Sequence, residues 1–299
     1  MLVHANEIPI DDLLVKRLVA EQFPEWAGLP LEPPGQSGSS NRLYRLGTDY
    51  LVRLPRQPGG GDTIVKEHQW QRVLQDHLDI RIPEIIALGQ PSLIFPETWS
   101  VQRWIPGTRL NAGSPANAAL TQDLARAIRQ LRAIPLPDVV RETLRPYRGQ
   151  SLKQHDRQFH RNVDGCRNID GLDLDLDRIL TIWEHALDQP DAVGNTWFHS
   201  DLVAENLLVD EAGRLTAILD FGGLGIGDPA IDLHGAWEIF TRVDRKAFRD
   251  AVGVSEAEWL RARAWALAVP LMTFTYYWRS MPGRIHDRMT MIQAVLEED

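Results

Sequence analysis

The sequence has a single cysteine, no long apolar run and no excess of basic residues. Because Cys166 has no partner within the chain, an internal disulfide is excluded and a cysteine-rich zinc site cannot form. No apolar stretch approaches the roughly 20 residues that a helix needs to cross a bilayer. The first residues lack the basic and then apolar pattern of a secretion signal. We therefore expect a cytoplasmic protein with no membrane contact.

The chain is also short of positive charge. Lys and Arg number 32 against 41 Asp and Glu, which gives a net charge of −9 at pH 7. General nucleic-acid binders need a basic surface for the phosphates, so no nucleic-acid partner is expected. The 299 residues are 43% hydrophobic, which suffices for two lobes that each bury a core.

Two polar motifs follow one another in the second half of the chain. His199, Asp201 and Asn206 form the pattern H-x-D-x-x-x-x-N, and Asp220 opens the tripeptide D-F-G. In kinases, a carboxylate placed like Asp201 meets the substrate hydroxyl. An amide and a carboxylate placed like Asn206 and Asp220 hold Mg²⁺ on the nucleotide phosphates. The order and spacing of the motifs therefore indicate phosphoryl transfer.

The residues between the two motifs predict how they are held. Apolar runs at 207–209 and 217–219 flank the turn 210–213, a pattern typical of a β-hairpin with a polar cluster at each outer end. The alternative is that these polar residues cap ordinary turns, which leaves the position of D-F-G unexplained. We interpret His199 as an orienting residue that hydrogen-bonds the backbone near Asp220, not as an acid or base.

These motifs resemble the aminoglycoside phosphotransferase and choline kinase family, whose members phosphorylate small molecules and include macrolide phosphotransferases. The resemblance extends to segments 51–55, 104–107 and 227–233 and covers roughly residues 10–280. Protein kinases usually place Arg between the His and the Asp and carry A-P-E after D-F-G. This chain has neither, and Ser200 stands where the phosphotransferase family usually has Gly. A small acceptor is therefore favoured over a protein.

The resemblance implies an α+β, two-lobed protein-kinase-like fold. A small antiparallel-sheet N-lobe, residues 1–104, would bind the nucleotide, and a largely helical C-lobe, residues 105–299, would carry the catalytic and acceptor-binding residues. The implied reaction moves the γ-phosphoryl group of ATP, or of GTP, to a hydroxyl of a small molecule. Asp201 would orient or deprotonate that hydroxyl, and Asn206 and Asp220 would hold Mg²⁺.

A polar turn near the N-terminus is the candidate phosphate loop. The sequence predicts strands at 42–46 and 50–54, and the turn 35–41 lies directly before them. Small residues in such a turn let backbone N–H groups and hydroxyls approach the phosphates. The residues expected to contact the phosphates are Ser37, Ser39, Ser40 and Asn41.

The cation on the following strand departs from the usual kinase pattern. Kinases place Lys on the third strand and pair it with a Glu of the next helix, whereas this strand offers Arg53, with Arg56 as the fallback. A helix that begins near Thr63 carries Glu67, the candidate partner. The alternative is an exposed arginine on an edge strand. The glycine run 59–61 is interpreted as a loop, not as a phosphate-binding motif.

The hinge between the lobes is predicted near residue 104. Strands are expected at 85–88 and 99–104, and Pro106 with Gly107 ends the second of them. The residues whose backbone groups would pair with the adenine edge are Arg103, Trp104 and Ile105.

Helical periodicity marks three further segments. Apolar residues recur at helical spacing over 11–22, 116–133 and 174–187. A capping box at Ser255 predicts the start of a long, aromatic-rich helix. Pro270 is expected to kink this helix.

The distribution of charge suggests a class of acceptor. Residues 199–239 contain only one Lys or Arg, Arg214, against eight carboxylates: Asp201, Glu205, Asp210, Glu211, Asp220, Asp228, Asp232 and Glu238. We expect Asp228 to start a turn and Asp232 to brace the catalytic loop. The remaining carboxylates would give a potential that attracts a cation. The hypothesis is an acceptor with an amine or quaternary nitrogen beside its hydroxyl, as in aminoglycosides, amino-sugar macrolides or choline.

Other functions are compatible with the same motifs. A metabolic kinase for choline, homoserine or a sugar would keep every one of them, and a non-catalytic nucleotide-binding scaffold would keep the fold without turnover. A protein kinase is least favoured. The motifs do not distinguish ATP from GTP, resistance from metabolism, or a monomer from an oligomer.

Overall fold

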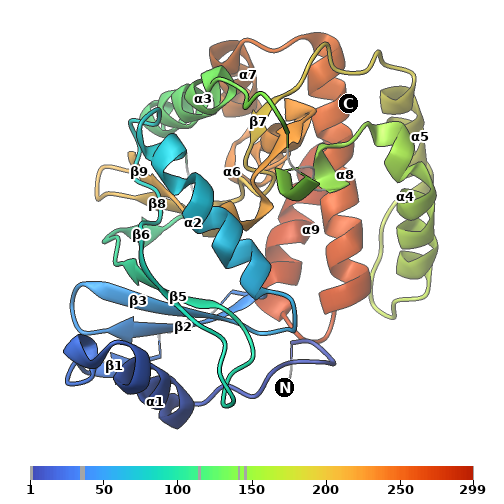
Figure 1. The fold of residues 1–299 in the computed structure, drawn as a ribbon. Coiled ribbons are helices and arrows are strands. Elements are labelled where there is room, and N and C mark those ends of the chain that lie inside the picture. The colour runs from blue at the N-terminus through green and yellow to red at the C-terminus, as the bar shows by residue number, and fades with distance from the viewer. Residues whose placement is uncertain (1–2, 34–37, 114–115, 141, 145–146, 299) are drawn as a thin grey trace. The chain divides into compact units, whose positions relative to one another are not determined.

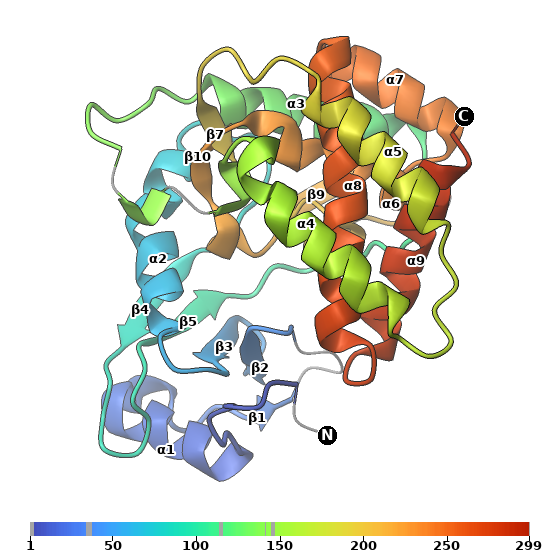
Figure 2. The same cartoon turned by 90° about the vertical axis from the view of Figure 1, so that its right-hand side faces the viewer.

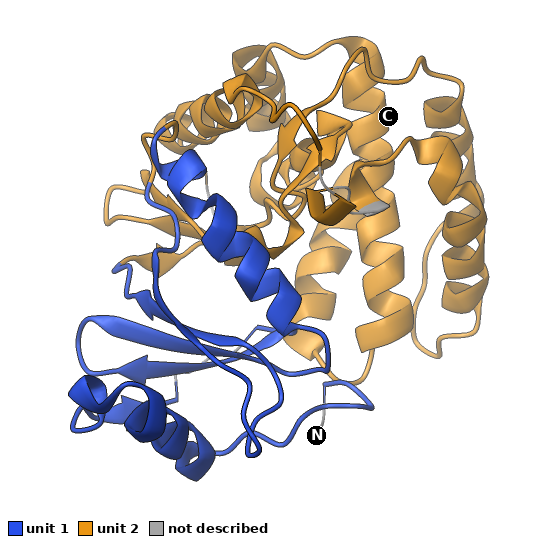
Figure 3. Cartoon of the chain, in the orientation of Figure 1, with its two compact units in different colours: residues 1–76, 81–106 blue, residues 77–80, 107–299 orange. Residues whose placement is uncertain are grey.

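The chain divides into two compact units, shown in different colours in Figure 3. Unit 1 comprises residues 1–76 and 81–106, and unit 2 comprises residues 77–80 and 107–299. The residues described by the computed structural model are 3–33, 38–113, 116–140, 142–144 and 147–298. Among the described helices, none combines the length and the apolar character needed to span a membrane.

Unit 1 contains a five-stranded antiparallel sheet in the order β1-β2-β3-β5-β4. Its strands are β1 (Leu31–Glu32), β2 (Asn41–Leu46), β3 (Tyr50–Pro55), β4 (Ile85–Gly89) and β5 (Trp99–Arg103). The turn between β2 and β3 contains Gly47 at φ 58°, a left-handed conformation that costs glycine little. The four strands predicted in this part of the chain are confirmed, with ends shifted by one residue.

Two helices pack on the sheet of unit 1 (Figure 1). Helix α1 (Asp12–Gln22) begins where the Asp11 side chain accepts the Leu14 N–H at 2.8 Å. Residues of α1 and the sheet form one apolar core that includes Val15, Leu18, Tyr44, Val52, Leu54 and Val101. Helix α2 (Gly61–Gln75) is fixed to β4 because the Gln71 side chain bonds both the N–H and the carbonyl of Ile85.

Unit 2 is mostly helical. Its longer helices are α3 (Ala118–Ala133), α4 (Leu152–Arg167), α5 (Leu176–Leu187), α7 (Arg242–Val252), α8 (Glu256–Tyr277) and α9 (Pro282–Leu296). Helix α8 packs against α4, α5 and α9, and α3 packs against α7; Figure 2 shows α4 and α5 beside α8. Ser255 caps α8 by accepting the Glu258 N–H at 3.2 Å, as predicted. Pro270 lies inside α8, which continues to Tyr277.

Short strands and one short helix hold the motif-bearing loops of unit 2. They are β6 (Thr108–Arg109), β7 (Thr196–Phe198), β8 (Leu207–Val209), β9 (Leu215–Ile218), β10 (Gly225–Gly227) and α6 (Ala236–Ile239). Strands β8 and β9 are antiparallel neighbours, which confirms the predicted hairpin. Strand β7 pairs with β10, so the segment after D-F-G returns beside the segment before the first motif.

Candidate active site

The loop between β7 and β8, residues 199–206, is called the catalytic loop below. Buried carboxylates hold its backbone. Asp232 accepts the N–H of His199 at 2.9 Å and that of Ser200 at 2.6 Å, and Glu238 accepts the N–H of Ala204 at 2.8 Å. The bracing role predicted for Asp232 is confirmed. The role of Glu238 was not predicted.

His199 connects the two sequence motifs and is fully buried. Its Nε2 lies 2.9 Å from the carbonyl of Leu219, directly before Asp220, so Nε2 carries the proton and donates. Its Nδ1 accepts the N–H of Asp201 at 3.2 Å. The ring also packs edge-on against Phe221, with centroids 4.5 Å apart. Both ring nitrogens are engaged with backbone, which confirms the predicted hydrogen bond from His199 to the backbone beside Asp220.

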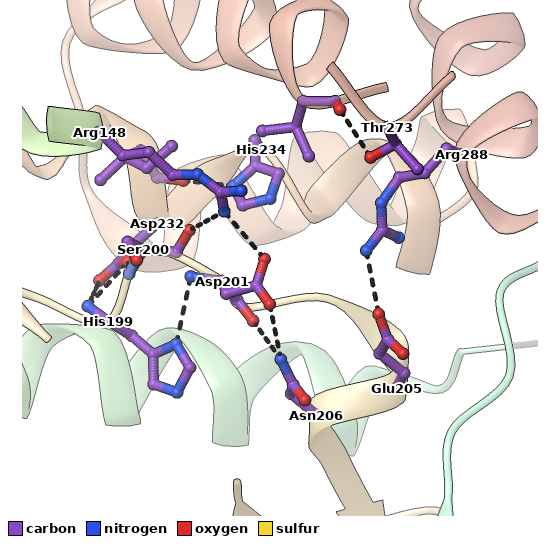
Figure 4. Close-up of polar contacts among 12 residues, drawn as sticks. Arg148, His199, Ser200, Asp201, Glu205, Asn206, Asp232, His234, Thr273 and Arg288 are labelled. Carbon is purple, nitrogen blue, oxygen red and sulfur yellow. Dashed lines mark hydrogen bonds and ion pairs between the residues drawn. The ribbon is translucent and has the colours of Figure 1, made fainter. Parts of the chain in front are cut away.

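The carboxylate of Asp201 is contacted on both of its oxygens (Figure 4). Asn206 donates from Nδ2 to Oδ2 at 3.0 Å and to the Asp201 carbonyl at 2.9 Å. Arg148, from the turn Tyr147–Gly149, donates to Oδ1 at 3.2 Å. The side chains of Arg148 and Asp201 are 26% and 30% exposed, so a small molecule can reach this carboxylate.

The charge of Asp201 is fixed by its neighbours. Burial disfavours the ionised form, but the positive charges of Arg148, Arg288 and Arg284 outweigh burial and hold the pKa of Asp201 well below its ordinary range. Asp201 therefore stays ionised at physiological pH. So weak a base is suited to orienting a hydroxyl, whose proton it can take up only late, as the phosphoryl group is transferred.

A network of ion pairs lies behind the catalytic loop. Arg288 of α9 pairs with Glu238 and, at 3.2 Å, with Glu205 of the loop, while Arg284 pairs with Glu205 at 2.9 Å. The side chains of Arg288 and Glu238 are almost fully buried. Burial raises the pKa of Glu238 to about 7, against the opposing charge of Arg288. Helix α9 thus stabilises the loop that presents the motif residues.

Asn206 and Asp220 come together at the open end of the hairpin. The N–H of Leu219 donates to the carbonyl of Asn206 at 2.8 Å, so Asp220 follows directly beside Asn206. The amide nitrogen of Asn206 faces Asp201, and its amide oxygen accepts no hydrogen bond from the described residues. An amide oxygen and a carboxylate are ligands that Mg²⁺ accepts, so these side chains fit the predicted metal role.

Such a metal would also need oxygens from the nucleotide. Within the described part of the chain, no group of three or more His, Cys, Asp or Glu side chains could hold a metal ion. Mg²⁺ in kinases is typically bound by one or two protein ligands together with substrate phosphates. A pair made of Asn206 and Asp220 agrees with that arrangement.

The backbone is strained on both sides of the site. Among the described residues, Ser200 (φ 75°) and Asp220 (φ 60°) are the only non-glycine residues with positive φ, a conformation that costs about 1–2 kcal/mol. A Cβ on Gly223 would lie 1.9 Å from the Ser200 Oγ and 2.9 Å from the His199 carbonyl. The glycine after D-F-G is therefore required by the close approach of the catalytic loop.

Most carboxylates of the segment 199–239 are already engaged. Those paired with arginines are Asp201, Glu205, Asp228 and Glu238. Those that accept backbone N–H groups include Asp210, Asp228 and Asp232. The bond of Asp228 to the Ala230 N–H confirms the predicted turn. Arginines from outside the segment thus cancel much of the negative potential on which the cationic-acceptor hypothesis depends.

In unit 1, the predicted ion pair is present. Arg53 donates to Glu67 at 2.5 Å, and their side chains are 6% and 4% exposed, which excludes an exposed edge-strand arginine. With its amide oxygen turned toward β3, Asn41 also accepts from Arg53, at 3.0 Å from Nε and 2.9 Å from Nη2. The sequence did not predict that Asn41 would hold Arg53. The predicted contact of Asn41 with the nucleotide phosphates stays a prediction.

Arg56 was the fallback for the strand cation that pairs with Glu67, but it has other partners. It pairs with Glu7, donates from Nε to the Gly38 carbonyl at 3.0 Å, and its N–H bonds the Ser40 carbonyl at 2.9 Å. Arg56 therefore anchors the end of the candidate phosphate loop, and Arg53 remains the cation that pairs with the helix. Of the predicted phosphate-loop residues, Ser37 lies outside the described residues.

The predicted hinge residues are partly used by the sheet. The N–H of Arg103 donates to the Glu84 carbonyl at 2.9 Å, and the N–H of Trp104 donates to the Asp49 carbonyl at 2.7 Å. Adenine contacts from these two residues would therefore have to come from their carbonyl groups. Ile105 follows them and leads into Pro106, the last residue of this stretch of unit 1.

The ion pair of unit 1 leads to a test by double substitution. Arg53→Ala and Glu67→Ala should each raise the ATP concentration needed for half-maximal rate. Because partners in one ion pair are coupled, the double variant should be less impaired than the sum of the singles. Initial rates against ATP concentration measure this, with Arg17→Ala as a control, since Arg17 of α1 also pairs with a glutamate, Glu21, at 2.6 Å. Strict additivity would show that the pair has no joint role in ATP use.

Comparison with known proteins identifies the family. A model of the phosphotransferase enzyme family matches residues 32–265. The GDP complex of wild-type aminoglycoside 2'-phosphotransferase-IIIa is similar in structure, with a TM-score of 0.74 and 18% identity over 97% of this chain and 100% of that chain. The streptomycin-ATP-APH(2")-IIa ternary complex has a TM-score of 0.61 and 17% identity, over 89% and 91%.

A macrolide enzyme has the same fold. Macrolide 2'-phosphotransferase MphH from Brachybacterium faecium has a TM-score of 0.60 and 19% identity, over 97% of this chain and 99% of that chain. A search of the curated proteins finds no match. These likenesses confirm the predicted fold class, with an antiparallel-sheet N-terminal part and a helical C-terminal part. Since the family match spans more than half of the sequence, the chain belongs to the phosphotransferase enzyme family.

Proposed function

We propose that the protein is a small-molecule kinase that transfers the γ-phosphoryl group of ATP to a hydroxyl, in the cytoplasm and with Mg²⁺. One observation carries this proposal. The accessible, ionised carboxylate of Asp201 lies in the same loop as Asn206, and Asp220 directly follows Leu219, whose N–H bonds the Asn206 carbonyl at 2.8 Å. Relatives solved with GDP and with ATP support the use of a nucleotide.

Each residue has a distinct part in the proposed reaction. Asp201 accepts a hydrogen bond from the acceptor hydroxyl, orients its oxygen and takes up its proton. Arg53, held by Glu67 and Asn41, steadies the α- and β-phosphates. Mg²⁺, when held by Asn206 and Asp220, supplies positive charge to the phosphate oxygens.

The identity of the acceptor is the finer part of the proposal. The streptomycin complex of a relative and the macrolide enzyme with the same fold favour an antibiotic acceptor and a resistance role. A metabolic acceptor such as choline, homoserine or a sugar is the second candidate. The chemistry at Asp201 is the same for both, so only the compounds that bind beside it distinguish them.

A screen coupled to ADP release tests the proposed function. The purified protein is given ATP or GTP with Mg²⁺ and, in turn, streptomycin, kanamycin, a macrolide, choline, homoserine or glucose. We expect acceptor-dependent ADP release that stops when EDTA removes the metal. An Asp201→Asn preparation controls for contaminating kinases. Nucleotide binding without turnover on any acceptor would instead support the non-catalytic scaffold.

A further inference from the structure

Three arginines lie around the loop that carries Asp201. Arg148 donates to Oδ1 at 3.2 Å and to the carbonyl of Ser200 at 3.4 Å. Arg288 and Arg284 lie behind the same loop through their pairs with Glu205. A group that binds on the Oδ1 side of Asp201 therefore meets the guanidinium of Arg148 as well as the carboxylate.

The two oxygens of Asp201 mark two sides of the site. Asn206 approaches Oδ2 and Arg148 approaches Oδ1, and Figure 4 shows them reaching the carboxylate from different directions. In the proposed reaction the metal and the phosphates belong beside Asn206 and Asp220. The side at Oδ1 is the one left for the acceptor. The Arg148 side chain, 26% exposed, is accessible there.

Two carboxylates behind this side, Glu205 and Glu238, are themselves paired with arginines. Glu205 is neutralised by Arg284 and Arg288. Glu238 is buried against Arg288, and its pKa is raised to about 7 by burial. His234 is fully buried with Nδ1 bonded to a backbone carbonyl, and burial lowers its pKa to about 4, so it is neutral.

We propose that Arg148 binds the acceptor and that the preferred acceptor carries an anionic group, a carboxylate or a phosphate, beside the hydroxyl that is phosphorylated. This inference rests on the proposed kinase activity. Among the acceptors considered there it disfavours the cationic aminoglycosides and amino-sugar macrolides, in contrast to the cationic-acceptor hypothesis. The planar guanidinium of arginine matches the geometry of carboxylates and phosphates. An ammonium group at the same place would meet a like charge, which lowers affinity.

Two series of hydroxy compounds that differ mainly in charge test this inference. One series is glucosamine, glucose and glucuronate, and the other is ethanolamine, ethylene glycol and glycolate. We measure ADP formation from ATP at varied acceptor concentration. The anionic member of a series should exceed the cationic member in kcat/KM by about tenfold or more, the effect expected of one hydrogen bond between charged groups. An anion that binds without being phosphorylated should still inhibit the hydrolysis of ATP, in which water is the phosphoryl acceptor.

Substitution of Arg148 separates acceptor binding from a purely structural role. Arg148→Gln should raise KM for the anionic acceptor, or weaken its inhibition, by about tenfold, with a smaller effect on the neutral member. Arg148→Lys, which keeps the charge, should retain part of the preference. Arg126→Gln is the matched control, since Arg126 also pairs with an aspartate, Asp123, at 2.9 Å. Thermal unfolding checks that every variant is folded.

Three results would overturn the proposal. The first is that the cationic members are the best acceptors. The second is an equal loss of kcat for all acceptors in Arg148→Gln, which would mean that Arg148 only holds Asp201. The third is that no anionic compound is phosphorylated or inhibits hydrolysis. If no ADP is formed with any acceptor, and none by hydrolysis of ATP, the proposed function itself is contradicted.

Discussion

Replacing Asp201 with Asn is expected to reduce turnover by about a hundredfold or more, the usual effect of losing a positioned base. Asn keeps the size of the side chain, and its amide oxygen can still accept the Arg148 hydrogen bond. Its NH2 group then faces Asn206, which loses one hydrogen bond but keeps the one to the carbonyl of residue 201. It cannot take up the proton of the acceptor hydroxyl. Nucleotide affinity should stay near normal, because Asp201 is not among the proposed metal or phosphate ligands. Rates of ADP release and calorimetric titration with Mg·ATP measure the two quantities.

The control for Asp201→Asn is Glu211→Gln in the hairpin turn. It also removes one negative charge from the motif segment, but from an exposed position. Its rate should match that of the native protein. Unchanged turnover in a folded Asp201→Asn variant would show that another group orients the hydroxyl.

Replacing Asp220 with Ala should reduce activity to background and weaken Mg·ATP binding. A hard cation requires oxygen ligands, and this change removes the only charged ligand that the site is proposed to supply. Rates measured over a range of Mg²⁺ concentrations should show that added metal does not restore the native rate. Turnover independent of Mg²⁺, or an unaltered Mg²⁺ response in the variant, would contradict the assignment.

The backbone at Asp220 calls for a second variant. Its φ of 60° is left-handed, so alanine there adds strain that could itself disturb the hairpin. Asparagine tolerates this conformation well, and Asp220→Asn removes the charge without that strain. We expect a folded protein with weakened Mg·ATP binding and low turnover. Full activity in Asp220→Asn would show that the carboxylate charge is not needed.

The parts of the structure that were predicted depend on local sequence patterns. Alternating apolar residues and glycine turns mark the strands of unit 1 and the hairpin, and fixed spacing places His199, Asn206 and Asp220 at its ends. The pairing of Arg53 with Glu67 was also predictable, because a strand and the next helix supply the two residues in a known order. Each of these features is formed by residues or elements that are close in the sequence.

The parts that were missed depend on contacts between distant segments. Arg148 and Arg288 reach the catalytic loop from other elements, and no spacing rule connects them to it. Helices α4 and α9 were not predicted, since buried polar residues such as His155, Asn162 and Arg288 interrupt their apolar faces. The number of carboxylates in the segment 199–239 likewise did not reveal which of them are paired with arginines.

The order of synthesis places the catalytic loop before the groups that hold it. Asp201 is made first, Asp232 and Glu238 follow, and Arg288 emerges about eighty residues after the loop, which takes several seconds at ordinary translation rates. A nascent or C-terminally shortened chain lacks the cation that joins Glu205 to Glu238. Loss of α9 should therefore leave the motif complete in sequence but its loop without support, so that the proposed activity depends on a segment far from the motif.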